Sequence, residues 1–117
     1  MGLVSSTGTV LSGGGYTGGG MNAPRGIAVD GGGNAWVASE HGPSLAEFSS
    51  ASSANHGTLL SPAGGWGSDA KLLEPYSVAV DAAGNIWVSN YGNNTLTEFI
   101  GLATPVKTPL LGPVRVP

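Results

Sequence analysis

Few side chains in this chain could carry acid–base or metal chemistry. It has two histidines, His41 and His56, and no cysteine. Glu40–His41 is the one place where a carboxylate and a histidine are neighbours, a pairing that a general base or a divalent metal could use. No set of nucleophile, base and orienting group can be named. The residues therefore predict no catalytic site, no metal site and no cofactor.

These residues lie in a chain built on an internal repeat. Residues 24–48 and 75–99 align without a gap at an offset of 51 residues, and 11 of the 25 positions are identical. At this offset, Glu40–His41 corresponds to Tyr91–Gly92. A gapless match of this length indicates a repeat architecture.

The composition limits the classes of partner. Only 9% of the 117 residues are charged, with 4 basic and 7 acidic side chains and a net charge of −3. Nucleic acid is not predicted as a partner, because phosphate binding needs clustered Lys and Arg, and the basic residues here are scattered. No segment approaches the length of apolar sequence that spans a bilayer. A sheet protein this poor in charge is expected to be exported, extracellular or periplasmic, with its export signal upstream of Met1.

Alternation of apolar residues predicts β-strands in both repeats. Ile27 and Val29 alternate with Ala28, and the second repeat has the same pattern. Further strands are expected at 35–39 and 86–90, and at 44–49 and 95–100, where Glu47 and Glu98 should point outward. An outer fourth strand is expected at 57–61. This predicts an all-β chain.

A repeated Asp-x-x-Gly-Asn motif predicts tight hairpin turns. Asp30 and Asp81 should accept backbone N–H groups within their turns, and Gly33 and Gly84 should have positive φ. An alternative is a cation-binding loop, although a third and a fourth oxygen ligand are missing from the motif.

The repeated tryptophans, Trp36 and Trp87, predict an equivalent buried position in each repeat. A tryptophan on a terminal sheet, with no second sheet packed on its face, is the expected exception and should be exposed. The apolar residues expected near the two rings are Val29, Val80, Leu45, Leu96, Phe48 and Phe99.

The pattern P-x-x-[IV]-A-V-D-x-x-G-N-x-W-V resembles the NHL-repeat β-propellers and, more loosely, the streptogramin-lyase and gluconolactonase-like propellers. The resemblance implies about two four-stranded antiparallel blades of an incomplete ring, since propellers close with roughly 4–8 blades. The implied divisions are an outer strand and Gly-rich loop (1–23), a first blade (24–61), an inter-blade loop (62–74) and a second blade with a Pro-rich edge strand (75–117).

The resemblance also implies partners and a binding face. The remaining blades, or copies of this chain that complete a ring, would be the partners. The binding face would lie on the loops that enter the first strand and join the second strand to the third. The residues implied there are Arg25, Glu40, His41, Trp66, Tyr76, Tyr91 and Asn93, with Tyr16 and Asn90 beside them. We expect a non-catalytic structural, ligand-binding or protein-binding module. The alternative is a fragment of a lyase or lactonase whose active residues lie in other blades.

Two segments could complete the second blade. Prolines at 105 and 109 leave one edge of a strand without N–H donors, which suits an outermost strand. We expect residues 105–110 to pair with 95–100, and residues 8–12 to lie unpaired or weakly attached beside the first blade.

Overall fold

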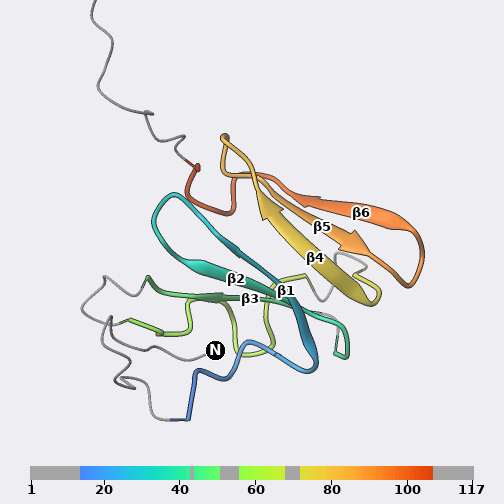
Figure 1. The fold of residues 1–117 in the computed structure, drawn as a ribbon, viewed down its shortest axis with the longest axis horizontal. Coiled ribbons are helices and arrows are strands. Elements are labelled where there is room, and N and C mark those ends of the chain that lie inside the picture. Colours follow the sequence, from blue (N-terminus) through green and yellow to red (C-terminus); the bar gives the residue numbers. More distant parts are fainter. Residues whose placement is uncertain (1–13, 43, 51–55, 68–71, 107–117) are drawn as a thin grey trace, which may run out of the picture.

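The computed structural model describes residues 14–42, 44–50, 56–67 and 72–106. These form two three-stranded antiparallel sheets without a helix, which confirms the all-β prediction (Figure 1). Sheet 1 contains β1 (Pro24–Val29), β2 (Ala35–Ser39) and β3 (Ser44–Phe48). Sheet 2 contains β4 (Pro75–Val80), β5 (Ile86–Asn90) and β6 (Thr95–Phe99). The two sheets are the two sequence repeats, each with its strands in chain order.

The first hairpin of each sheet closes as its motif predicts. Asp30 Oδ1 accepts the backbone N–H groups of Gly32 and Asn34, at 2.9 and 3.0 Å. Asp81 Oδ1 does the same for residues 83 and 85. The φ angles of Gly33 and Gly84 are 81° and 82°, a region in which glycine carries no Cβ penalty.

The second oxygen of each aspartate ties the turn to the following strand. Asp30 Oδ2 accepts the indole N–H of Trp36 at 2.9 Å, and Asp81 Oδ2 accepts that of Trp87 at 3.0 Å. Asp30 Oδ2 also accepts the N–H of Thr104, 74 residues along the chain. Both oxygens of each carboxylate therefore receive N–H donors, which is the turn arrangement rather than that of a cation loop.

The Asp81 turn makes folding stability depend on pH. The indole N–H of Trp87, followed by backbone donors, lowers the pKa of Asp81 from an ordinary value of 3.8 to about 2. A carboxyl group whose pKa is lower in the folded chain than in the unfolded chain stabilises the fold at pH values above its unfolded pKa. This stabilisation is lost as the pH falls toward the pKa in the folded chain.

We expect Asp81→Asn to unfold more easily at pH 7 and to lose less stability than the wild type between about pH 4 and 2. Urea unfolding at a series of pH values checks this, with Glu98→Gln in the same sheet as the control. Parallel wild-type and Asp81→Asn curves would contradict it.

Strand pairing divides each sheet into two faces. In sheet 1, Trp36 lies opposite Ala28 and Glu47, so these side chains share a face, while Val29 and Phe48 lie on the other face opposite Ala35.

Each of the four sheet faces is named after one residue on it. The Trp36 face of sheet 1 comprises Gly26, Ala28, Trp36, Ala38, Leu45 and Glu47. The Ile27 face of sheet 1 comprises Ile27, Val29, Ala35, Val37, Ala46 and Phe48. The Val78 face of sheet 2 comprises Val78, Val80, Ile86, Val88, Thr97 and Phe99. The Trp87 face of sheet 2 comprises Ser77, Ala79, Trp87, Ser89, Leu96 and Glu98.

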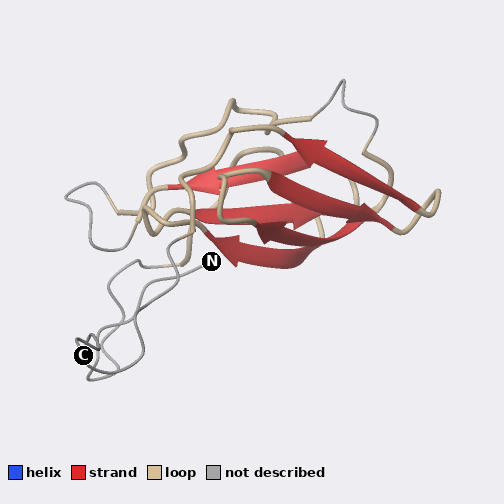
Figure 2. Cartoon of the chain, turned by 90° about the horizontal axis from the view of Figure 1, so that it is seen from above, coloured by secondary structure: helices blue, strands red, loops and turns tan. Residues whose placement is uncertain are grey.

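The main core lies where the Trp36 face packs on the Val78 face. Trp36, Leu45, Ile86 and Val88 are fully buried there. The two sheets form adjacent layers (Figure 2), and the strand of sheet 2 that contacts β1 and β2 is β4. Gly26 allows this approach: a Cβ on it would lie 2.7 Å from the carbonyl oxygen of Tyr76.

The predicted neighbours of the tryptophans were partly wrong. Leu45, Val80 and Phe99 do join the core around Trp36. Phe48 instead belongs to a second cluster on the Ile27 face, with Val37 and Ala46 under Tyr16, Met21 and Leu59. The alternation of the strands explains this difference, because Phe48 pairs with Ala35 rather than with Trp36. Trp87 is 38% exposed. Among the described residues, sheet 2 packs on another sheet only through its Val78 face, so the exposure of Trp87 on the opposite face is the exception that the sequence predicted.

The four-stranded blade was not found among the described residues, in which each sheet has three strands. The expected strand at 57–61 lies along β3, with a bridge between Leu59 and Phe48 and hydrogen bonds from the N–H groups of Leu60 and Ser61 to the carbonyl of Glu47. Trp66 makes a second bridge, to Leu45. A turn between the two bridges, closed by the N–H of Gly65 on the carbonyl of Pro62, interrupts the ladder. Residues 57–66 therefore line the edge of β3 without becoming a regular strand.

The C-terminal segment takes a different course from the one expected. Thr104 accepts the N–H of Gly31, and Val106 donates to Asp81, so the segment crosses the two hairpin turns instead of pairing with β6 at residues 105 and 106. The rest of the expected edge strand (107–110) and the expected strand at 8–12 lie outside the described residues. In the described part of the chain, no helix is long and apolar enough to cross a membrane.

Candidate binding surface

One end of the two sheets is built twice in the same way. β1 and β4 begin there, and the β2–β3 and β5–β6 turns lie beside them. The turn residue Glu40 donates its N–H to Ala23, and the equivalent Tyr91 donates to Glu74. Ala23 and Glu74 have φ of 54° and 47°, so each linker bends sharply before its strand. The linkers thereby hold the two turns beside the strand starts.

A β-bulge places one side chain of each repeat at this end. Pairing skips from Pro24 to Gly26 in β1 and from Pro75 to Ser77 in β4. The residues skipped are Arg25 and Tyr76, which are equivalent in the repeat. A bulge leaves its extra residue out of the ladder and re-aims its side chain.

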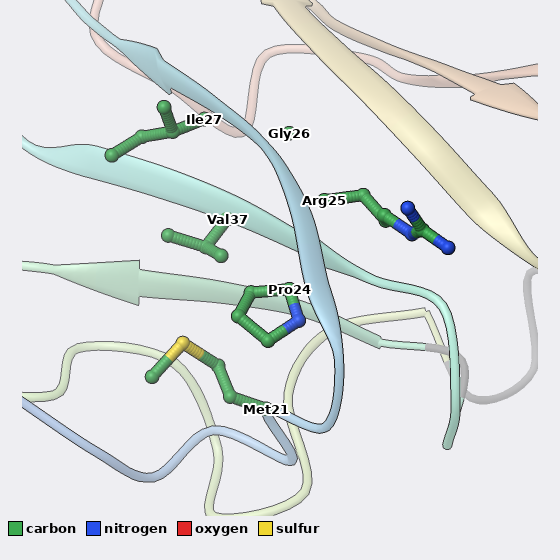
Figure 3. Close-up of a pocket in the computed structure, with 6 residues that line it drawn as sticks. All are labelled: Met21, Pro24, Arg25, Gly26, Ile27 and Val37. Atoms are coloured by element: carbon green, nitrogen blue, oxygen red, sulfur yellow. The ribbon is translucent and has the colours of Figure 1, made fainter.

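Four side chains meet there as a continuous row. Arg25 Nε donates to Glu40 Oε2, and the guanidinium carbon lies 5.3 Å from the centre of the Tyr76 ring. The rings of Tyr76 and Tyr91 are 6.1 Å apart at an angle of 38°. Figure 3 shows the Arg25 side chain extending from β1 toward β4. We call Glu40, Arg25, Tyr76 and Tyr91 the loop-end cluster.

The cluster combines accessible aromatic area with an oriented cation. Tyr76 and Tyr91 are 49% and 71% exposed, whereas Glu40 is largely covered. The hydrogen bond that Arg25 donates to Glu40, and then the negative charge of Glu40, raise the pKa of Arg25, which keeps the guanidinium charged. Tyrosine and arginine are enriched at protein interfaces, where each offers flat contact area and hydrogen-bonding atoms. The cluster therefore presents exposed aromatic rings beside a charged guanidinium.

The remaining predicted residues lie outside this row. His41 is exposed in the β2–β3 turn, where its backbone N–H donates to Asn22. Asn93 accepts the Thr95 hydroxyl at 2.6 Å within the β5–β6 turn. Trp66 is half-buried against the main core at the edge of β3.

Asn90 and Tyr16 have packing roles. Asn90 is buried, donates to the hydroxyls of Thr95 and Thr97, and accepts the N–H of Leu73, so it anchors the β5–β6 turn to its linker. Tyr16 stacks on Phe48, and its hydroxyl lies 2.9 Å from Nδ1 of His56.

Sequence reasoning did not foresee two features of the structure. The first is the contact between the bulged residues Arg25 and Tyr76. The sequence signal for it was the proline that begins each of the two strands, which is followed by Arg in one repeat and by Tyr in the other. The second is Glu47, which was expected to point outward. It is half-buried on the Trp36 face, and burial there is the main cause that raises its pKa.

Within the described ranges, no group of three or more His, Cys, Asp or Glu residues could hold a metal ion. The chain matches no protein-family model and no curated protein at the level of sequence.

Proposed function

We propose that this chain is a non-catalytic NHL-like β-propeller segment of two blades that binds a protein partner through the loop-end cluster. The observation that carries the proposal is the convergence of Arg25, Glu40, Tyr76 and Tyr91. Each repeat contributes one residue from a bulge and one from a turn. The row spans both sheets, so it exists only when the two repeats pack together. Support for an exported bacterial protein comes from the low charge content alone.

The experiment is a selection of random 12-residue peptides, displayed on phage, against the immobilised wild-type chain. The enriched peptides are then synthesised, and their affinity is measured for the wild type and for Tyr91→Ala. Loss of an aromatic anchor at an interface weakens binding by about 30-fold or more. Leu60→Ala, an exposed apolar residue away from the cluster, is the matched control and should bind as the wild type does.

Tyr91 makes no core contact that the variant would remove, so the far-ultraviolet circular dichroism of Tyr91→Ala should equal that of the wild type. Two results would contradict the proposal. One is a selection that enriches no peptide, and the other is a set of peptides that bind Tyr91→Ala as tightly as the wild type.

A further inference from the structure

The two outward faces of the molecule are repeat equivalents of the two faces that already pack together inside it. The Trp87 face of sheet 2 corresponds, position by position, to the Trp36 face of sheet 1. The Ile27 face of sheet 1 corresponds in the same way to the Val78 face of sheet 2. The internal contact joins a Trp36 face to a Val78 face. Each end of the molecule therefore presents one half of a contact whose geometry the chain itself displays.

Exposure shows what a neighbouring sheet covers. Val78 is 8% exposed inside the contact, whereas the equivalent Ile27 is 57% exposed. Leu45 is fully buried, whereas the equivalent Leu96 is 67% exposed. Terminal units of a repeat array that need no neighbour usually carry a polar outer face. Here both outer faces keep apolar side chains at the positions that the internal contact buries.

A hollow lies on each of the two outward faces. The first, of about 230 Å³, is lined by residues of the Ile27 face and its surroundings (Figure 3). Its lining residues are Met21, Pro24, Arg25, Gly26, Ile27 and Val37. The repeat equivalents of Met21, Ile27 and Val37 are Leu72, Val78 and Val88, and all three are buried in the main core.

The second hollow, of about 190 Å³, lies on the opposite end of the molecule. Its lining residues are Ser77, Val78, Ala79, Trp87, Ser89 and Leu96. The repeat equivalents of Trp87, Ser89 and Leu96 are Trp36, Ala38 and Leu45, which fill the main core from sheet 1. The two hollows are thus the two halves of one vacant contact.

We infer that a second copy of this chain docks head to tail, with the Trp87 face of one copy on the Ile27 face of the next. Such a contact joins two different patches, so it repeats from copy to copy and yields a ring or an open chain. The inference rests on the packing of sheet 1 on sheet 2 and does not require that the loop-end cluster binds a ligand.

One difference between the two repeats determines how closely the second copy can approach. Ser77 stands where the internal contact has Gly26, whose absent Cβ lets the sheets approach closely. The side chain of Ser77 must hold the second copy slightly farther away than sheet 2 lies from sheet 1. Ser77→Gly should therefore tighten association, while it removes no apolar contact.

The test measures mass in solution over a concentration series, by light scattering and sedimentation. We expect the wild type to form species of two or more copies. Leu96→Glu blocks only the Trp87 face and Ile27→Glu blocks only the Ile27 face, and each should weaken association by roughly 30-fold or more. Because both residues are exposed in the single chain, both variants should keep the wild-type circular dichroism. Leu60→Glu, at the edge of β3 and off both outward faces, is the control and should associate as the wild type does.

Mixing the two blocked variants separates this contact from a symmetric one. Leu96→Glu still has a free Ile27 face and Ile27→Glu still has a free Trp87 face, so the mixture should form dimers containing one of each and nothing larger. A wild type that stays monomeric throughout would overturn the inference. So would either blocked variant that associates by itself as the wild type does, since that result means a symmetric contact through its free face. A mixture that stays monomeric while the wild type associates would also overturn the inference. None of these results bears on peptide binding by the loop-end cluster, which Tyr91→Ala tests on the monomer.

Discussion

Replacing Trp36 with alanine should lower the free energy of unfolding by about 3–5 kcal/mol, the usual cost of removing a buried tryptophan. Trp36 is fully buried between the sheets, and its indole N–H satisfies the buried carboxylate of Asp30. The equivalent Trp87 makes the same hydrogen bond to Asp81 but is 38% exposed. Trp87→Ala should therefore cost less than half as much, although the two residues occupy identical positions in the sequence repeat.

Urea unfolding of both variants checks this, at a concentration low enough to keep the chain monomeric. The comparison isolates the effect of the neighbouring sheet, because the local turn and strand are the same in both repeats. Equal losses for the two variants would mean that sheet 2 does not cover Trp36.

Gly26→Ser should destabilise the chain by about 1–3 kcal/mol, the cost typical of overpacking. A Cβ at this position would lie 2.7 Å from the Tyr76 carbonyl oxygen and 2.8 Å from Ser77 Cα. These are backbone atoms of β4, so they cannot rotate away, and the sheets must separate. Serine is already tolerated at the equivalent position 77, which is exposed.

The matched control is Ser77→Ala, which should change the stability of the monomer by no more than about 0.5 kcal/mol. Thermal unfolding of the two variants beside the wild type provides the measurement. If Gly26→Ser were as stable as the wild type, the close approach of β1 and β4 would be wrong.

The hairpins could be predicted from the sequence because their causes are local. Each Asp-x-x-Gly-Asn motif contains both the acceptor and the left-handed glycine that its turn requires, and all side-chain hydrogen bonds of Asp81 fall within seven residues. The pairing of strands followed from the same motif, since a tight turn sets the register. The repeat then implied two equivalent sheets.

The errors concern contacts between distant segments. The course of residues 103–106 depends on the bond from Thr104 to Asp30, which no local pattern encodes. The segment beside β3 is divided between Leu59 and Trp66 by the turn from Pro62 to Gly65, which the short alternating run at 57–61 did not reveal. Both faces of each sheet are apolar, so alternation alone could not show which face of sheet 1 meets sheet 2.

The candidate surface was predictable in part. The resemblance to the NHL-repeat propellers implied that Arg25, Glu40, Tyr76 and Tyr91 lie on the loops of one face, and they form two equivalent pairs in the two repeats. Their mutual contacts depend on the distance between β1 and β4, which Gly26 controls and which the sequence pattern does not specify.

The most direct test of the packing of the two repeats is a nuclear Overhauser effect between Gly26 and Ser77 in the monomer. The Gly26 Hα that occupies the Cβ direction points at Ser77 Cα, where a Cβ would lie only 2.8 Å away. We predict a strong cross-peak between this proton and the Hα of Ser77, which persists on dilution. Its absence, with both resonances assigned and sharp, would show that the Trp36 face does not pack on sheet 2 and would contradict the account.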